Sequence, residues 1–176
     1  MTEPIISLDA HWQPASLLTL PAALSPWLLE QASLTARLKR HCQHFRVQVL
    51  HEANCSLPDF LRPLLGNAEQ ALLREVILWC NDKPCVYAQS WLPDTTIEKL
   101  TPLAQLGERP LGDYIFQHQG LRRGSIEATQ LDVLLPQFHI ATRCFTRRSV
   151  FQLQDMPLLV SEAFLPAISH LTEAVA

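Results

Sequence analysis

The sequence predicts an α+β fold in which helices pack on one face of an antiparallel sheet. Two observations support this: helical patterns lie early and in the middle of the chain, and strand patterns occur as neighbours joined by short turns. A length of 176 residues, 48% of them hydrophobic and 18% charged, fits one domain over residues 1–176. Residues 1–24 contain Pro4, Pro14 and Pro21, so an irregular N-terminal segment is expected there.

The first helix is expected over residues 26–43. Ser25-Pro26 joins a helix-capping serine to a proline suited to the first helical position. Apolar residues from Trp27 to Cys42 then recur on one helical face. From Phe45 onward apolar and polar residues alternate, which predicts that a strand follows.

Two hairpins and two short helices are expected after this strand. The hairpin strands are 72–80 with 85–92, around Asn81-Asp82-Lys83-Pro84, and 141–154 with 156–165, around Gln154-Asp155. One short helix begins near Thr95 and ends near Pro102, and another begins at Pro110 and runs through Phe116. Residues 131–140 are interpreted as a lengthened connection.

Charge, cysteine content and hydropathy exclude several classes of protein. The formal net charge is -3, so no overall basic field attracts nucleic acid, and Arg122-Arg123 and Arg147-Arg148 are interpreted as rim charges. The five cysteines are odd in number and form no Cys-x-x-Cys pair, so reduced thiols without a disulfide are expected. Three prolines interrupt the charge-free residues 10–29, and the N-terminus has no basic leader, so the protein is expected to be cytoplasmic without stable membrane insertion.

No metal site is expected. A cluster of histidines and cysteines between residues 41 and 55 has the spacing of neither a zinc ribbon nor a His-Glu-x-x-His helix. Nucleotide-binding loops and the serine-hydrolase elbow are also absent from the sequence.

Two charged residues interrupt apolar rows of predicted strands. Arg74 lies in a row with Leu72, Val76 and Leu78, and Glu162 lies in the row of the last strand. One interpretation is structural: Arg74 pairs with Glu162 or with Glu75, or each charge reaches water at a strand end. The other is a ligand cavity in which Arg74 binds a carboxylate and Glu162 accepts a hydrogen bond from a hydroxyl at the far end of the ligand.

Gly107-Glu-Arg-Pro110-Leu111-Gly112 has two interpretations as well. Pro110 has no N–H group, so the first free amide at this helix start belongs to Leu111 and is able to donate to an anion. The alternative is a tight turn that only joins two helices.

Four segments together resemble the chorismate pyruvate-lyase family. They are Leu73-Arg-Glu-Val-Ile-Leu-Trp-Cys80, Arg109-Pro-Leu-Gly112, Arg147-Arg-Ser149 and Pro157-Leu-Leu-Val-Ser-Glu-Ala-Phe-Leu-Pro166. Ser33-Leu34-Thr35 is similar to the family's Ser-Met-Thr. The resemblance extends in order from about Trp27 to Pro166.

This resemblance implies a six-stranded antiparallel sheet and an internal ligand site beneath helical flaps. It implies that Arg74 and the Leu111 amide bind a ring carboxylate, that Glu162 binds the ring hydroxyl, and that Leu34 forms part of the wall. Arg74 and Glu162 are the expected catalytic residues, and Arg148 is a candidate partner for a second carboxylate. No metal or organic cofactor is required.

The implied activity is elimination of pyruvate from chorismate to give 4-hydroxybenzoate, the first committed step of ubiquinone synthesis. One alternative is a non-catalytic sensor related to the effector domains of GntR-type regulators, although residues 1–24 cannot form the helix-turn-helix expected ahead of such a domain. Another is a weak enzyme that delivers 4-hydroxybenzoate to a membrane prenyltransferase. A monomer is expected.

Overall fold

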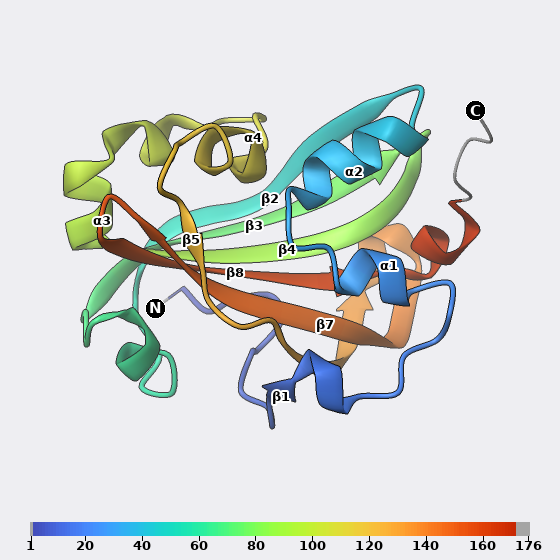
Figure 1. The fold of residues 1–176 in the computed structure, drawn as a ribbon, viewed down its shortest axis with the longest axis horizontal. Coiled ribbons are helices and arrows are strands. Elements are labelled where there is room, and N and C mark those ends of the chain that lie inside the picture. The colour runs from blue at the N-terminus through green and yellow to red at the C-terminus, as the bar shows by residue number, and fades with distance from the viewer. Residues whose placement is uncertain (1, 172–176) are drawn as a thin grey trace.

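A single twisted antiparallel sheet organises the protein, which a computed structural model describes over residues 2–171 (Figure 1). In this part of the chain the sheet has eight strands in the order β1-β6-β7-β8-β4-β3-β2, and β5 pairs with β7. Their bounds are β1 (Gln13–Pro14), β2 (Phe45–Ser56), β3 (Gln70–Cys80), β4 (Lys83–Pro93), β5 (Arg122–Arg123), β6 (Glu127–Leu135), β7 (Ile140–Leu153) and β8 (Met156–Phe164). The expectation of six strands is corrected to eight: β1 and β5 have two residues each, too few for an alternating pattern.

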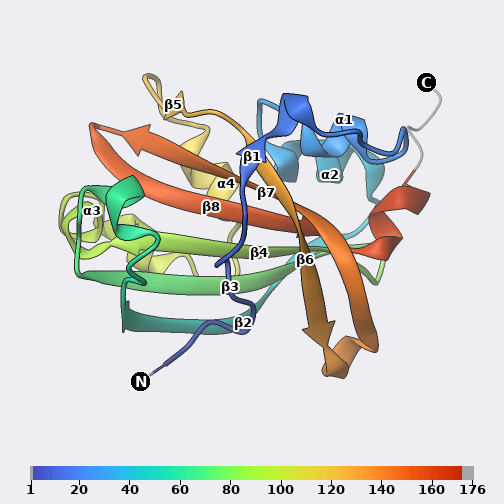
Figure 2. The same ribbon diagram turned by 90° about the horizontal axis from the view of Figure 1, so that it is seen from below.

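Within residues 2–171, four short α-helices and five 3₁₀ turns cover the sheet. The helices are α1 (Ser25–Leu28), α2 (Leu34–His41), α3 (Asp94–Lys99) and α4 (Leu111–Ile115), and the turns are η1 (Ala15–Leu17), η2 (Arg62–Leu65), η3 (Thr101–Gln105), η4 (Pro136–Phe138) and η5 (Pro166–His170). Figures 1 and 2 show α2 and α4 over one face, and the N-terminal segment with η2 on the opposite face. The α+β class is confirmed, but both faces are covered.

The two predicted hairpins are confirmed. β3 and β4 are joined by Asn81 and Asp82, and β7 and β8 by Gln154 and Asp155. All four turn residues have φ between 50° and 63°. Asn and Asp tolerate this left-handed region better than most residues, and two-residue turns of this kind match the twist of paired strands.

The prediction of one helix over 26–43 is wrong, because the chain breaks between α1 and α2. Ser33 caps α2 by accepting a hydrogen bond from the Ala36 amide at 3.1 Å. The carbonyl of Leu28, the last residue of α1, accepts a hydrogen bond from Arg147 Nη1 at 3.0 Å. The break is therefore held by a residue more than a hundred positions away, which no local periodicity reveals.

The interpretation of residues 131–140 as a connection is also wrong. Residues 131–135 complete β6, whose register with β7 extends from Glu127↔Arg148 to Leu135↔Ile140. Only η4 and His139 lie between the two strands, and His139 has φ 55°.

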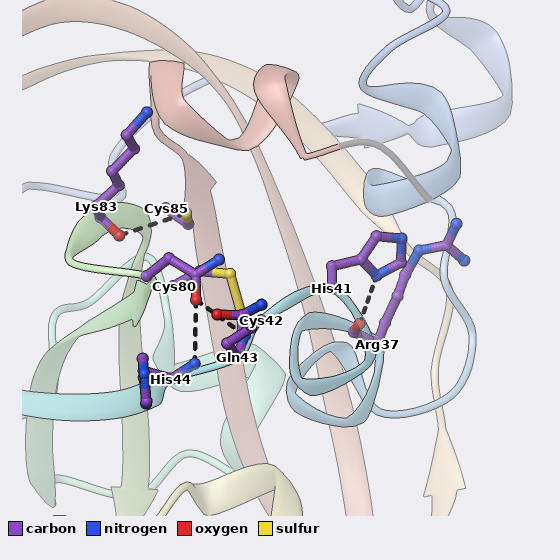
Figure 3. Close-up of a disulfide and its surroundings, with 9 residues drawn as sticks. Arg37, His41, Cys42, Gln43, His44, Cys80, Lys83 and Cys85 are labelled. Atoms are coloured by element: carbon purple, nitrogen blue, oxygen red, sulfur yellow. Dashed lines mark hydrogen bonds between the residues drawn. A yellow bond between two sulfur atoms is a disulfide. The ribbon is translucent and has the colours of Figure 1, made fainter. Parts of the chain in front are cut away.

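The expectation of five reduced cysteines is corrected by a disulfide between Cys42 and Cys80 (Figure 3). Cys42 follows α2, and Cys80 ends β3, where it pairs in register with Phe45. This pairing brings the two Cα atoms to 5.3 Å, within the range that a disulfide bridges. Their separation of 38 residues gives no local sequence signal.

Cys55, Cys85 and Cys144 are free and buried. Burial raises the pKa of the Cys85 and Cys144 thiols to about 11. Within residues 2–171 no helix is long and apolar enough to cross a membrane.

Candidate active site

A cavity lies between the sheet and the helices α2 and α4. Its floor is formed by β3, β4, β7 and β8, and its roof by residues of α2 and α4. Measured as the space open to the centre of a water-sized sphere, its volume is about 50 Å³. A single water needs roughly 10–15 Å³ on this measure, so the cavity has room for several water-sized groups.

The cavity separates two apolar clusters on the same face of the sheet. Leu34, Val76 and Ala88 belong to the cluster beneath α1 and α2, whereas Ile115 and Phe151 belong to the cluster beneath η3 and α4. Apolar walls on both sides leave a small number of polar groups to orient a ligand, as in most small-molecule sites.

Arg74 lines this cavity from the middle of β3 and is only 2% exposed. Its Nη1 donates to Glu52 Oε2 at 2.8 Å, and its Nη2 donates to the carbonyls of Gly107 at 2.8 Å and Arg109 at 3.0 Å. The ion partner is thus Glu52 on the neighbouring strand, and neither Glu162 nor Glu75. These bonds fix the guanidinium at the wall next to Pro110 and Leu111.

Glu162 lines the cavity from β8 and is 8% exposed. Its Oε1 accepts a hydrogen bond from Arg147 Nε at 3.0 Å, and the two residues are cross-strand neighbours. Because Oε1 is paired, Glu162 is able to offer its second oxygen to a hydroxyl group in the cavity.

The sheet register places Arg74 and Glu162 on one face but not in contact. Val76, two residues after Arg74, pairs with Ala88, which in turn pairs with Glu162. Strand and residue spacing therefore separate the two Cα atoms by roughly 12 Å. The structure therefore places these two charged side chains around one cavity without pairing them with each other.

The roof of the cavity brings together the other predicted contacts. Leu34 and Leu111 are the first residues of α2 and α4, and both line the cavity. A Cβ added to Gly112 would lie 3.2 Å from Thr35 Oγ1, so the two helix starts approach closely. Four of the five predicted site residues, Arg74, Glu162, Leu34 and Leu111, thus lie around one cavity.

Arg148, the fifth predicted site residue, does not line the cavity. Successive residues of a strand point to opposite faces, so Arg148 points away from the face that carries Arg147. Its Nε donates to Glu127 Oε1 at 3.1 Å, and its guanidinium lies 4.6 Å from the centre of the Trp12 ring.

Arg123 and Arg147 line the cavity and were missed as site residues, having been interpreted as rim charges. Arg147 is 1% exposed, and its Nη1 donates to carbonyls of Trp27, Leu28 and Glu30. Burial, and then the neighbouring charge of Arg147, lower the pKa of Arg123 to about 10, so the Arg123 guanidinium is still charged at neutral pH. The signal available in the sequence was the position of Arg147 in the same strand row as Phe151.

The structure is an α+β domain with a charged cavity between its sheet and its helices. Two solved structures share the fold. The effector domain of PhnF from Mycobacterium smegmatis has a TM-score of 0.60 at 15% identity, covering 78% of this chain and 91% of that one. The C-terminal domain of the histidine utilization repressor from Pseudomonas syringae pv. tomato has a TM-score of 0.59 at 12% identity, covering 76% and 99%.

Sequence comparison is more specific. The sequence model of the chorismate lyase family matches residues 6–174. A probable chorismate pyruvate-lyase of Pseudoalteromonas translucida is 45% identical over 170 residues, covering 92% of this chain and 94% of the relative. A second, from Psychromonas ingrahamii, is 36% identical and covers 82% and 83%. The chain belongs to the chorismate lyase family.

Proposed function

We propose that this protein is a chorismate pyruvate-lyase, a carbon–oxygen lyase that converts chorismate into 4-hydroxybenzoate and pyruvate. The observation that supports this most strongly is the cavity with Arg74 at one end and Glu162 at the other, in a chain of this family. Chorismate is a ring with a carboxylate at one end, a hydroxyl at the other and an enolpyruvyl ether beside the hydroxyl. The charged side chains at the two ends of the cavity suit the carboxylate and the hydroxyl of that ring.

In the proposed complex Arg74 binds the ring carboxylate, supported by the Leu111 amide. Arg74 is suited to this role because Glu52 and two carbonyls hold its guanidinium in place before the ligand arrives. Leu34 and the apolar walls enclose the ring, and Glu162 accepts a hydrogen bond from the ring hydroxyl.

The reaction breaks the bond between the ring carbon and the ether oxygen. The hydrogen on the ring carbon that bears the hydroxyl leaves, the ring becomes aromatic, and the enolpyruvyl methylene gains a hydrogen to give the methyl group of pyruvate. The hydrogen reaches that carbon directly or through Glu162. Aromatisation drives the reaction, and holding the reacting groups in position contributes roughly 7–11 kcal/mol in well-oriented intramolecular reactions.

The proposal also places the reaction in the cytoplasm, with a monomeric protein that feeds 4-hydroxybenzoate to ubiquinone synthesis through a membrane prenyltransferase. A sensor related to GntR-type effector domains is the second candidate, because the effector domain of PhnF shares the fold. The two candidates differ in whether bound chorismate is converted.

The test is to mix purified protein with chorismate in buffer without added metal and follow ultraviolet absorbance. The proposal predicts that 4-hydroxybenzoate and pyruvate form in equal amounts. The control is the variant Glu162→Ala, which is expected to lose most activity while still unfolding cooperatively. Tight binding of chorismate with no product would favour the sensor and contradict the lyase.

A further inference from the structure

Two arginines at the Glu162 end of the cavity, Arg123 and Arg147, have no role in holding the ring of the substrate in the proposed complex. Arg74 is paired with Glu52 and Arg147 with Glu162, so each of these cations has a carboxylate within 3.0 Å. Arg123, from β5, makes no ion pair with a carboxylate within residues 2–171. Arg123 is therefore the one arginine of the cavity wall without a carboxylate at ion-pair distance among residues 2–171, although Glu162 and Glu30 act on its charge from farther away.

The hydrogen bonds of Arg123 and Arg147 leave donors available. Arg123 uses Nε for Ser149 Oγ at 3.1 Å and Nη1 for the carbonyls of Glu30 and Gln31 at 3.3 and 3.1 Å. Arg147 uses Nε and Nη1 in the same way, on Glu162 and on carbonyls near α1. In the part of the chain that the structure describes, neither Nη2 has a hydrogen-bond acceptor.

The surrounding groups hold these two guanidiniums in place. Phe151 lies 4.9 Å from the Arg123 guanidinium, measured to its ring centre, and the carbonyl of Glu30 accepts hydrogen bonds from both arginines. The two cations repel each other, and the carboxylates of Glu162 and Glu30 act against that repulsion on Arg123 only from beyond ion-pair distance. A carboxylate beside them would relieve that repulsion.

We propose that Arg123 and Arg147 together bind the enolpyruvyl carboxylate of the substrate. The inference rests on the proposed function, and ring chemistry supports it: the enolpyruvyl ether is attached next to the hydroxyl that Glu162 binds. With the ring carboxylate on Arg74, the second carboxylate lies at the end of the cavity where Arg147 contacts Glu162.

The arginine pair distinguishes the substrate from the aromatic product. 4-Hydroxybenzoate retains the ring carboxylate and the hydroxyl but lacks the second carboxylate. Arg74 and Glu162 therefore bind substrate and product alike, whereas the arginine pair favours the substrate. After elimination the second carboxylate belongs to pyruvate, which leaves separately.

The test uses Arg123→Gln, with Arg123→Lys as the charge-conserving control. A hydrogen bond to a charged group is worth about 1.5–3 kcal/mol, so the KM for chorismate is expected to rise about 10- to 100-fold in Arg123→Gln. The Kd for 4-hydroxybenzoate, measured by calorimetry, is expected to stay within about twofold of wild type by the same reasoning. Arg123→Lys is expected to recover part of the loss.

Three results would overturn the proposal. The first is an equal fall in the affinities of Arg123→Gln for chorismate and 4-hydroxybenzoate, as expected of a purely structural arginine. The second is no change in either affinity, and the third is a fall in kcat at constant KM. An arginine that binds the second carboxylate produces none of these results.

A second test uses only wild-type protein, so it still applies if the Arg123 variants fail to fold. It compares binding of 3-(carboxymethoxy)-4-hydroxybenzoate with binding of its side-chain amide. The acid is expected to bind about 10- to 100-fold more tightly than the amide, and equal affinity would contradict the role of the arginine pair. If wild-type protein makes no product from chorismate, the proposed function fails, while this comparison still tests the second anion site.

Discussion

The two faces of the sheet both bury charged residues, but only one face directs them toward a cavity. Arg74 and Glu75 are neighbours in β3, 2% and 0% exposed, and point to opposite faces. Arg74 lines the cavity, whereas Glu75 is enclosed by protein groups. Burial of a charge alone therefore does not identify a ligand site.

The partners of Glu75 account for its burial completely. Its Oε1 accepts hydrogen bonds from the Tyr87 hydroxyl, the Gln89 amide and the backbone amide of Ile5, and its Oε2 lies 2.8 Å from His51 Nδ1. Burial and the charge of Glu75 raise the pKa of Tyr87. This network holds the N-terminal segment around Ile5 against the face of the sheet that carries Glu75. On this face the buried charge therefore has a structural role.

Among the changes considered, the largest effect is expected from replacing Glu75 on this structural face. Glu75→Ala leaves several buried donors without an acceptor, each at a cost of about 1–3 kcal/mol, and is expected to lower the free energy of unfolding by about 3–5 kcal/mol. Urea unfolding measures it. Activity per folded molecule should be retained, and a loss of activity without a loss of stability would mean that Glu75 belongs to the site.

Arg74→Met is the matched change on the cavity face, since it keeps much of the side-chain length but removes the charge. Binding of 4-hydroxybenzoate is expected to weaken by about 2–5 kcal/mol, as in truncation of one member of a buried charge pair. Calorimetry measures this, with thermal unfolding as the control for folding. Near-normal affinity and turnover would remove Arg74 from the site.

Tyr87→Phe sharpens the comparison with a smaller change on the structural face. It removes one hydrogen bond to Glu75 while three other donors remain, so a loss of about 1–2 kcal/mol of unfolding free energy is expected. The KM for chorismate should not change. A shifted KM would show that the two faces are coupled.

The smallest effect concerns the cysteines. Cys55, Cys85 and Cys144 are buried, so a thiol reagent added to the native protein is expected to label none of them. Protein denatured without reductant should show three thiols, because Cys42 and Cys80 form a disulfide. Five reactive thiols would contradict that bond.

Local chemistry made part of this structure predictable. Asn81-Asp82 and Gln154-Asp155 are turn residues between strand patterns, and both hairpins form there. The alternation of residues along a strand shows which side chains share one face of a sheet. For this reason Arg74 and Glu162, the lone charges in apolar rows, could be selected from the sequence, and both line the cavity.

The remaining features depend on contacts between distant parts of the chain. Arg147 ends the first helical segment by binding carbonyls of residues 27–30, so its burial could not be seen from its neighbours. Glu52 became the partner of Arg74 through the register of β2 and β3, which shifts between Val49 and His51. A bulge of this kind changes which residues face each other.

The most direct test of the account is a crystal structure of the protein with bound 4-hydroxybenzoate. The account predicts the ring inside the cavity, with its carboxylate on Arg74 and the Leu111 amide and its hydroxyl on Glu162. Ligand density elsewhere, with this cavity empty or filled by water, would contradict it.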